Sequence, residues 1–242
     1  MIVEGGRMRT RLSMILIAIL SAAPASGATR HFEVAGFEKV RVEGPFRVKL
    51  TTGVPTSASV SGPQSGVDRV AVDLIGRTLV IHNNLSVWGS SSDSQNAGPV
   101  EVEIGTHDLN AAVLMGAGLL QINAVKGLSF DVSVQGSGQV AIARADVDQF
   151  SVNLVGTASS IIAGRAGMLK LTTQGVSSFD GSGLVAKDAT IAANGASTIK
   201  AGVTNSAKID ASGPAAVTLS GNPACIVKLG GSASVTGCGK SQ

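Results

Sequence analysis

Residues 132–143 read VSVQGSGQVAIA, and the interpretation of this stretch decides the fold. Apolar residues alternate with small or polar ones on both sides of a Gly-Ser-Gly, and no charged residue interrupts them. Taken alone, the pattern fits a hairpin turn, a flexible low-complexity segment, a glycine-rich phosphate loop, or one copy of a repeat. The rest of the chain distinguishes these interpretations.

The stretch belongs to the second of seven copies of a degenerate repeat. Aligned on a small-residue corner, the copies begin at Asn110, Phe130, Phe150, Leu169, Ala189, Ala207 and Cys225. The corner glycines, 18–20 residues apart, are Gly116, Gly136, Gly156, Gly175, Gly195, Gly213 and Gly231. Before each corner, apolar residues recur at every second position, which predicts strands with one buried face. A second glycine series predicts a second corner at Gly164, Gly183, Gly202 and Gly221.

A repeat of this length cannot bury its own apolar face, so neighbouring copies must stack. It is too short for a propeller blade, and it lacks the motifs of leucine-rich repeats and of calcium-binding nonapeptides. We therefore predict an all-β fold, a right-handed parallel β-helix of about 18–20 residues per coil. A left-handed form built on hexapeptides is the alternative. No helix pattern and no suitably spaced lysine follow the glycines, which excludes a phosphate loop.

Residues 1–28 have the three parts of a secretory signal peptide. The apolar run MILIAIL (14–20) is preceded by three arginines and followed by the small residues SAAPASGA (21–28). An uncleaved membrane anchor is the alternative, but the run is shorter than the ~20 residues that a span needs. We predict cleavage after Ala25 or Ala28, a periplasmic, secreted or cell-surface location, and no transmembrane segment after cleavage.

The basic charge of the chain comes largely from this leader. Without Glu4 and the arginines at positions 7, 9 and 11, the net charge falls from +3 to about +1. No cluster of basic residues with interleaved aromatics remains, so we expect no nucleic-acid partner.

In this interpretation residues 29–109 form an N-terminal β region and residues 110–242 form the β-helix repeats, and the two are parts of one continuous domain. Alternating stretches at 32–50, 67–82 and 100–104 predict strands. They either begin the β-helix or cap its first coil, whose open edge would otherwise invite pairing with another chain.

Two cysteines, Cys225 and Cys238, are the only ones in the chain. In an oxidising compartment they are expected to form one disulfide, which would pin the last coil. One buried and one exposed thiol are the alternative. Neither a CxxC motif nor a zinc-ligand spacing is present.

Catalytic chemistry has no visible carrier in the sequence. The two outward rows before the corner place no carboxylates in adjacent coils, as a paired acid and base or a calcium cluster would require. Asp146 and Asp148 share one inter-coil loop with Arg144 and Arg165 nearby, which fits a cation or substrate site or, alternatively, a solvated charged turn. We predict no catalytic residues, no metal ligands and no cofactor.

The loop WGSSSDSQNAG (88–98) carries the single tryptophan of the chain. Trp88 is either a protruding surface contact or a side chain packed against the cap. The histidines His31, His82 and His107 are scattered without the spacing of metal ligands.

Three stretches carry a resemblance to a known family: FEVAGFEKVRVEGPFRVKLTTG (32–53), DLIGRTLVIHNN (73–84) and PVEVEIGTHDLNAAVLMGAGLL (99–120). They resemble the bacterial family described as "putative auto-transporter adhesin, head GIN domain", over roughly residues 32–238. The resemblance implies an exported bacterial β-helix, and no catalytic residues are carried over from it. Because GCGKSQ (237–242) follows the last coil directly, we expect no membrane barrel there and no self-transport.

From these features we predict an exported, non-enzymatic protein that acts in adhesion, envelope-associated binding or self-assembly. Its partner is unknown; an envelope or cell-surface glycan or protein, or a second copy of the chain, would fit. The alternative is a lyase or hydrolase acting on polysaccharides from a β-helical scaffold.

Overall fold

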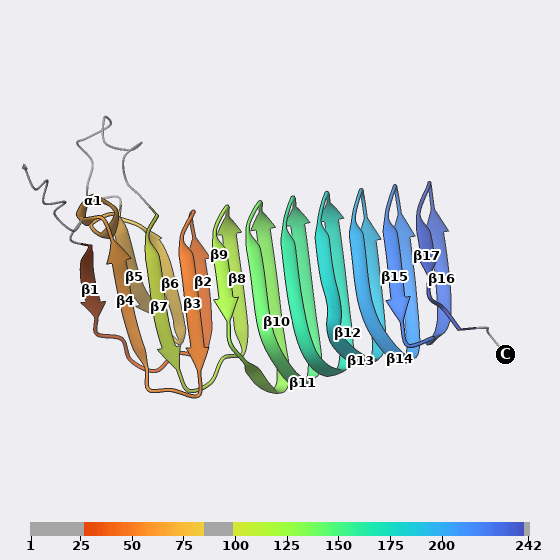
Figure 1. Ribbon diagram of the computed structural model, residues 1–242, viewed down its shortest axis with the longest axis horizontal. Coiled ribbons are helices and arrows are strands. Elements are labelled where there is room, and N and C mark those ends of the chain that lie inside the picture. Colours follow the sequence, from red (N-terminus) through yellow and green to blue (C-terminus); the bar gives the residue numbers. More distant parts are fainter. Residues whose placement is uncertain (1–26, 85–98, 240–242) are drawn as a thin grey trace, which may run out of the picture.

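The computed structural model describes residues 27–84 and 99–239, and within them the chain winds into a rod of stacked coils (Figure 1). The described residues contain one short helix, α1 (Gln64–Val67), and are otherwise dominated by strands. Their parallel stacking confirms the β-helix, while its right-handed sense stays a prediction.

The seven repeats stack in sequence order through parallel strand pairs. Val132, for example, is the direct partner of Ala112 in the preceding coil and of Val152 in the following one. The repeat alignment is therefore the strand register. The strands are β8 (Ala111–Gly116), β9 (Leu119–Ile122), β10 (Val125–Gly136), β11 (Gln139–Gly156), β12 (Ser159–Gly175), β13 (Ser178–Asn194), β14 (Thr198–Ser212), β15 (Ala216–Ser220), β16 (Ala224–Gly230) and β17 (Ser234–Thr236).

Each coil has two faces that meet at the glycine corner, where the upward arrowheads of Figure 1 end. We call the segments before the corner the first face and those after it the second face. The corner is tight: Gly136 has a φ of 109°, and a Cβ there would lie 2.9 Å from the Gly116 oxygen. Both the backbone conformation and the preceding coil therefore exclude a side chain.

The opposite side of each coil, here called the rounded edge, is built differently. The chain bends within the long strands β11 to β14, and the pairing shifts there, as between Ile142 and Ala145. Of the four glycines predicted for this corner, Gly164 and Gly221 have positive φ, whereas Gly183 and Gly202 do not. A second corner is therefore present, but only two of its four glycines use a positive φ; pairing shifts of the β-bulge type accompany the bend.

The core is filled by inward rows from both faces. In the first-face row, Phe130 and Phe150 have ring centroids 5.8 Å apart, and smaller residues continue the row toward the C-terminus. In the second-face row, the small Ser160 is followed by the large Phe179 in the next coil. A large side chain in one coil thus sits beside a small one in its neighbour. No member of either row is more than 3% exposed: Phe130, Phe150, Leu169, Ala189 and Ala207; Leu120, Val140, Ser160, Phe179, Ile199 and Val217.

The N-terminal region adds layers out of sequence order. β2 (Lys39–Glu43) and β3 (Arg47–Thr52) pair in parallel with β8 and β9. On their other side they pair in parallel with β6 (Thr78–Asn83) and β7 (Glu101–Thr106). The coil formed by β2 and β3 therefore lies between the layer of β6 and β7, which comes later in the chain, and the first repeat.

Antiparallel strands close this end of the rod. β5 (Val70–Ile75) pairs with β6, β4 (Ser57–Gly62) with β7, and β1 (Ala28–Phe32) with β4, while α1 contacts β1 and β4. The strands of the N-terminal region therefore both extend the β-helix and cap it. The boundary between residues 109 and 110 stays a prediction.

Candidate binding surfaces

The first face presents two straight rows of outward side chains. The strand register places each member directly beside its counterpart in the next coil. Asp131 is flanked by Ala111 and Ser151, so it has no carboxylate neighbour in its row. The rows are Ala111, Asp131, Ser151, Lys170, Thr190, Lys208 and Ile226, and Val113, Ser133, Asn153, Thr172, Ala192, Asp210 and Lys228.

A shallow depression of about 380 Å³ lies on this face across β8, β10, β11 and β12. Short apolar side chains line it together with hydroxyl, amide and charged groups: Asp131, Ser133, Ser151, Asn153, Lys170 and Thr172. These groups offer hydrogen-bond donors and acceptors at the coil spacing of about 4.8 Å. The sequence predicted the outward rows but not the depression. The depth of a surface depends on the relative lengths of side chains that become neighbours only when the coils stack.

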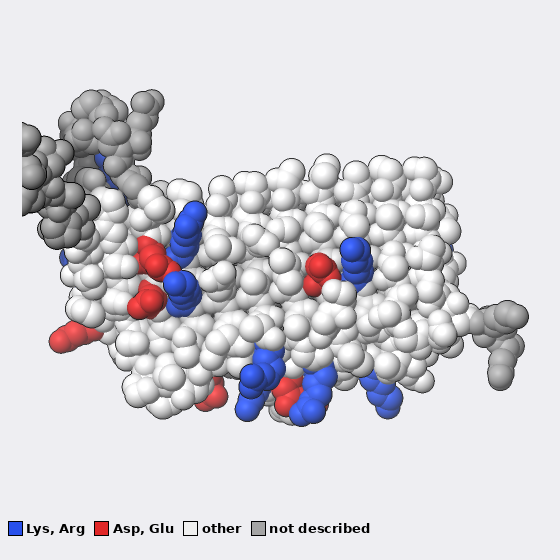
Figure 2. All heavy atoms as spheres, in the orientation of Figure 1, with Lys and Arg blue, Asp and Glu red and all other residues white. Residues whose placement is uncertain are grey.

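The second face carries few charges over most of its length. Figure 2 shows charged side chains of both signs gathered near the N-terminal layers and along the lower edge, with a largely uncharged area between. Near the N-terminal layers, Lys49 forms an ion pair with Glu101, which raises the pKa of the lysine through that hydrogen bond. Further along, Asp180 lies opposite Lys200 in the strand register.

Asp146 and Asp148, the predicted cation or substrate site, lie on the rounded edge. The Arg165 guanidinium donates to both carboxylate oxygens of Asp146, at 2.7 and 2.8 Å, and holds the pKa of that carboxyl below its usual value. Asp146 and Arg165 are direct partners in adjacent coils. Asp146 is therefore engaged in an ion pair between coils, and the structure does not bring it together with Asp148 into a cluster of ligands.

No group of three or more potential metal ligands occurs among residues 27–84 and 99–239. The His82 Nε2 atom instead lies 2.6 Å from the Asp73 Oδ2 atom across the β5–β6 pair. This hydrogen bond raises the pKa of His82. Trp88 lies outside the described residues, as does most of the predicted signal peptide.

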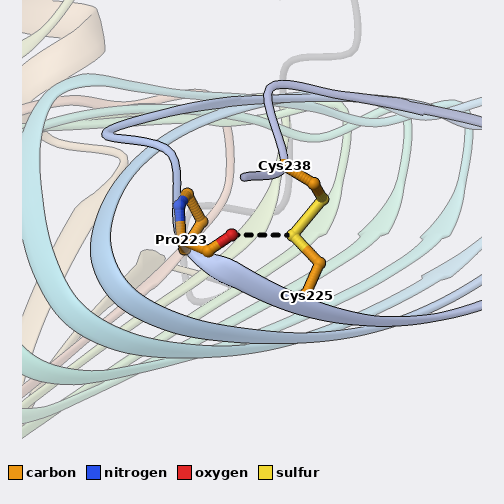
Figure 3. The surroundings of a disulfide bond; sticks show 3 residues. All are labelled: Pro223, Cys225 and Cys238. Carbon is orange, nitrogen blue, oxygen red and sulfur yellow. Dashed lines mark hydrogen bonds between the residues drawn. A yellow bond between two sulfur atoms is a disulfide. The ribbon is translucent and has the colours of Figure 1, made fainter. Parts of the chain in front are cut away.

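A disulfide joins Cys225 in β16 to Cys238 beyond β17 (Figure 3). The Gly239 N–H also donates to the Pro223 oxygen, which ties the following residue to the rounded edge. Together these bonds fasten residues 237–239 against the last coil.

A protein-family model described as "Putative auto-transporter adhesin, head GIN domain" matches residues 36–223. The chain belongs to this family. The match covers the N-terminal layers and most of the repeats, so the resemblance seen in the sequence is confirmed. No curated protein matches the chain.

Solved structures share the fold at low sequence identity. A Bacteroides fragilis protein described as a putative adhesin has a TM-score of 0.72 and 22% identity, with 88% of this chain and 95% of that one covered. A "putative lipid binding protein" of Parabacteroides distasonis has a TM-score of 0.67 and 16% identity, with 88% and 96% covered. A putative adhesin of Parabacteroides merdae has a TM-score of 0.64 and 15% identity over the same shares. At these identities the likeness concerns the fold.

In the part of the chain that the structure describes, no helix is long and apolar enough to cross a membrane. Family membership is consistent with an adhesin-like protein that is exported or located at the surface.

Proposed function

We propose that this protein is an exported, non-enzymatic binding protein that uses the depression on its first face to hold polar, hydroxyl-rich ligands such as envelope or cell-surface glycans. The observation that carries the proposal is the surface chemistry of that depression. Hydroxyl, amide and charged groups converge on it from three adjacent coils. The predicted signal peptide and the adhesin family support export and a role in adhesion.

The rigidity of the scaffold favours binding through repeated weak contacts. Ser133 and Asn153 are direct partners, as are Ser151 and Lys170. Their spacing is fixed by backbone hydrogen bonds, so a ligand that matches it loses little affinity to ordering of the protein. A polymer with a regular repeat of hydroxyl groups fits this geometry better than a compact small molecule, because the depression is shallow.

The alternative of a polysaccharide hydrolase needs two carboxylates around one glycosidic bond. In the first-face rows, Asp131 and Asp210 are four coils apart. Asp210 lies beside the Lys228 ammonium, at 3.6 Å. This separation favours binding over turnover.

The test is a glycan-array and polysaccharide pull-down assay on the purified chain. Asn153→Leu and Lys170→Met are expected to weaken binding about tenfold or more, because each removes a polar group from the depression. Lys200→Met is the matched control, because Lys200 is also exposed but lies on the second face.

Three results would contradict the proposal. The first is no binding to any glycan or envelope fraction. The second is equal binding by all three variants. The third is release of cleaved polysaccharide that disappears in Asp131→Asn, which would support the enzymatic alternative.

A further inference from the structure

The C-terminal end of the rod differs from the N-terminal end in having exposed core positions. Val227 and Leu229 continue the inward rows of the first face, where their direct partners Ile209 and Ala211 are 1% and 0% exposed. In the last coil, Val227 is 41% and Leu229 is 51% exposed. The reason is that nothing in the described chain stacks beyond β16, so its inward face is left open.

The disulfide covers only part of this end. Residues 237–239 are fastened beside Cys225, which is partly buried (Figure 3). Val227 and Leu229 lie further along β16, and Ile226 on its outer side is 72% exposed. An apolar patch thus remains next to strands that, among residues 27–84 and 99–239, have a pairing partner on one side only: β16 pairs with β14, and β17 with β15.

Such an edge is a template for another strand. The N-terminal end offers no equivalent parallel edge, because antiparallel β1, β4 and β5 and helix α1 cover it. Head-to-tail stacking of copies would have to disrupt that cap. A two-fold arrangement, by contrast, sets the open end of one copy against the open end of another and pairs β16 with β16 in antiparallel orientation.

We propose that the C-terminal end, formed by β16 and β17 with Val227 and Leu229 at its centre, is an interface for a second copy of this chain. Two rods would join end to end. The contact is closed, since each rod has one open end, so association stops at the dimer.

The charge at this end permits such a contact. A two-fold interface brings a charged side chain near the axis close to the same side chain of the second copy. Lys228 is the only charged residue between positions 213 and 239. Its ammonium lies 3.6 Å from the Asp210 carboxylate, which offsets the repulsion.

The area at the end sets the strength of the interaction. A coil about 23 Å long and about 20 Å wide would bury on the order of 900 Å² in total, which is below the ~1,200 Å² at the lower end of the range for stable interfaces. We therefore expect a weak dimer, with a dissociation constant of micromolar or above. This surface lies away from the first-face depression, so the inference goes beyond the proposed function and is tested without any glycan.

The experiment is sedimentation velocity over a concentration series, combined with small-angle X-ray scattering, on the chain with its disulfide intact. We expect a monomer–dimer equilibrium and a maximum dimension that nearly doubles in the dimer. Leu229→Lys should raise the dissociation constant about tenfold or more, because it places a charge in the contact. Val176→Lys is the matched control: Val176 is 62% exposed at a corner remote from the end, and its replacement should leave the dimer unchanged.

A chain that stays monomeric at millimolar concentration would overturn the proposal. So would a dimer that Leu229→Lys does not weaken, or one whose maximum dimension shows rods lying side by side. Thermal unfolding of both variants checks that each is folded before its association is measured.

Discussion

Replacing Gly136 with alanine adds one methyl group and tests whether the repeat needs glycine at its corner. Gly136 is the corner glycine of VSVQGSGQVAIA, with a φ of 109°. The added Cβ would lie 2.9 Å from the Gly116 oxygen and 3.2 Å from the Gly116 Cα and nitrogen. These are backbone atoms of the preceding coil, so they cannot move aside as a flexible side chain would.

Two costs add at this position. Placing alanine at a positive φ costs about 1–3 kcal/mol. Forcing extra volume into a packed region costs about 1–3 kcal/mol more. We therefore expect Gly136→Ala to lower the free energy of unfolding by about 2–6 kcal/mol, from the sum of those two ranges.

Gly53→Ala separates the two costs. Gly53 follows β3 with a φ of 77°, and a Cβ there would have no neighbour within 4 Å. This variant should lose only the conformational part, about 1–3 kcal/mol. Urea unfolding monitored by circular dichroism gives both values. If Gly136→Ala proves no more destabilising than Gly53→Ala, the close stacking of corner glycines is not what restricts the position.

Three further predictions concern the core, the last coil and pH. Thr173 is fully buried and its hydroxyl has no hydrogen-bond partner among the described residues; Thr173→Val should raise the free energy of unfolding by about 1–3 kcal/mol in urea titrations. Reducing the bond between Cys225 and Cys238 opens a link across 13 residues. We expect a loss of about 3 kcal/mol, with hydrogen exchange rising first in the last coil. The raised pKa of His82 means that its stabilising bond to Asp73 is fully present below pH ~6.5 and is lost as pH rises through the folded-state value; NMR titration of Asp73→Asn should show the pKa of His82 lowered.

The repeated part of the fold could be predicted from the sequence, because stacking imposes the same pattern of inward apolar residues on every coil. The period of two identified the inward rows correctly, and residues such as Val132 and Leu154 are buried as expected. In the N-terminal region, alternation predicted stretches that overlap β2, β3, β5, β6 and β7, but it predicted neither β4 nor the order in which these strands stack. β4 has the sequence SASVSG, whose small polar residues give a weak alternation, and its pairing with β7 joins residues far apart in the chain.

The candidate surface was predicted in part for the same reason. The outward rows follow from the register, but their depth and charge pairing do not. Asp146 illustrates this limit: its proximity to Arg165 was expected, yet only the coil geometry makes them direct partners joined by two hydrogen bonds.

By itself, the sequence determined the β-helix, its corner glycines and its buried rows, because each is a local pattern repeated at the coil spacing. Only the tertiary structure decided the order of the N-terminal layers, the cap at one end and the exposed core residues at the other. These depend on which coil has a neighbour. Val227 and Leu229 occupy inward positions by pattern. Whether such a position is buried depends on whether another coil stacks on it, and the identity of the residue alone does not determine this.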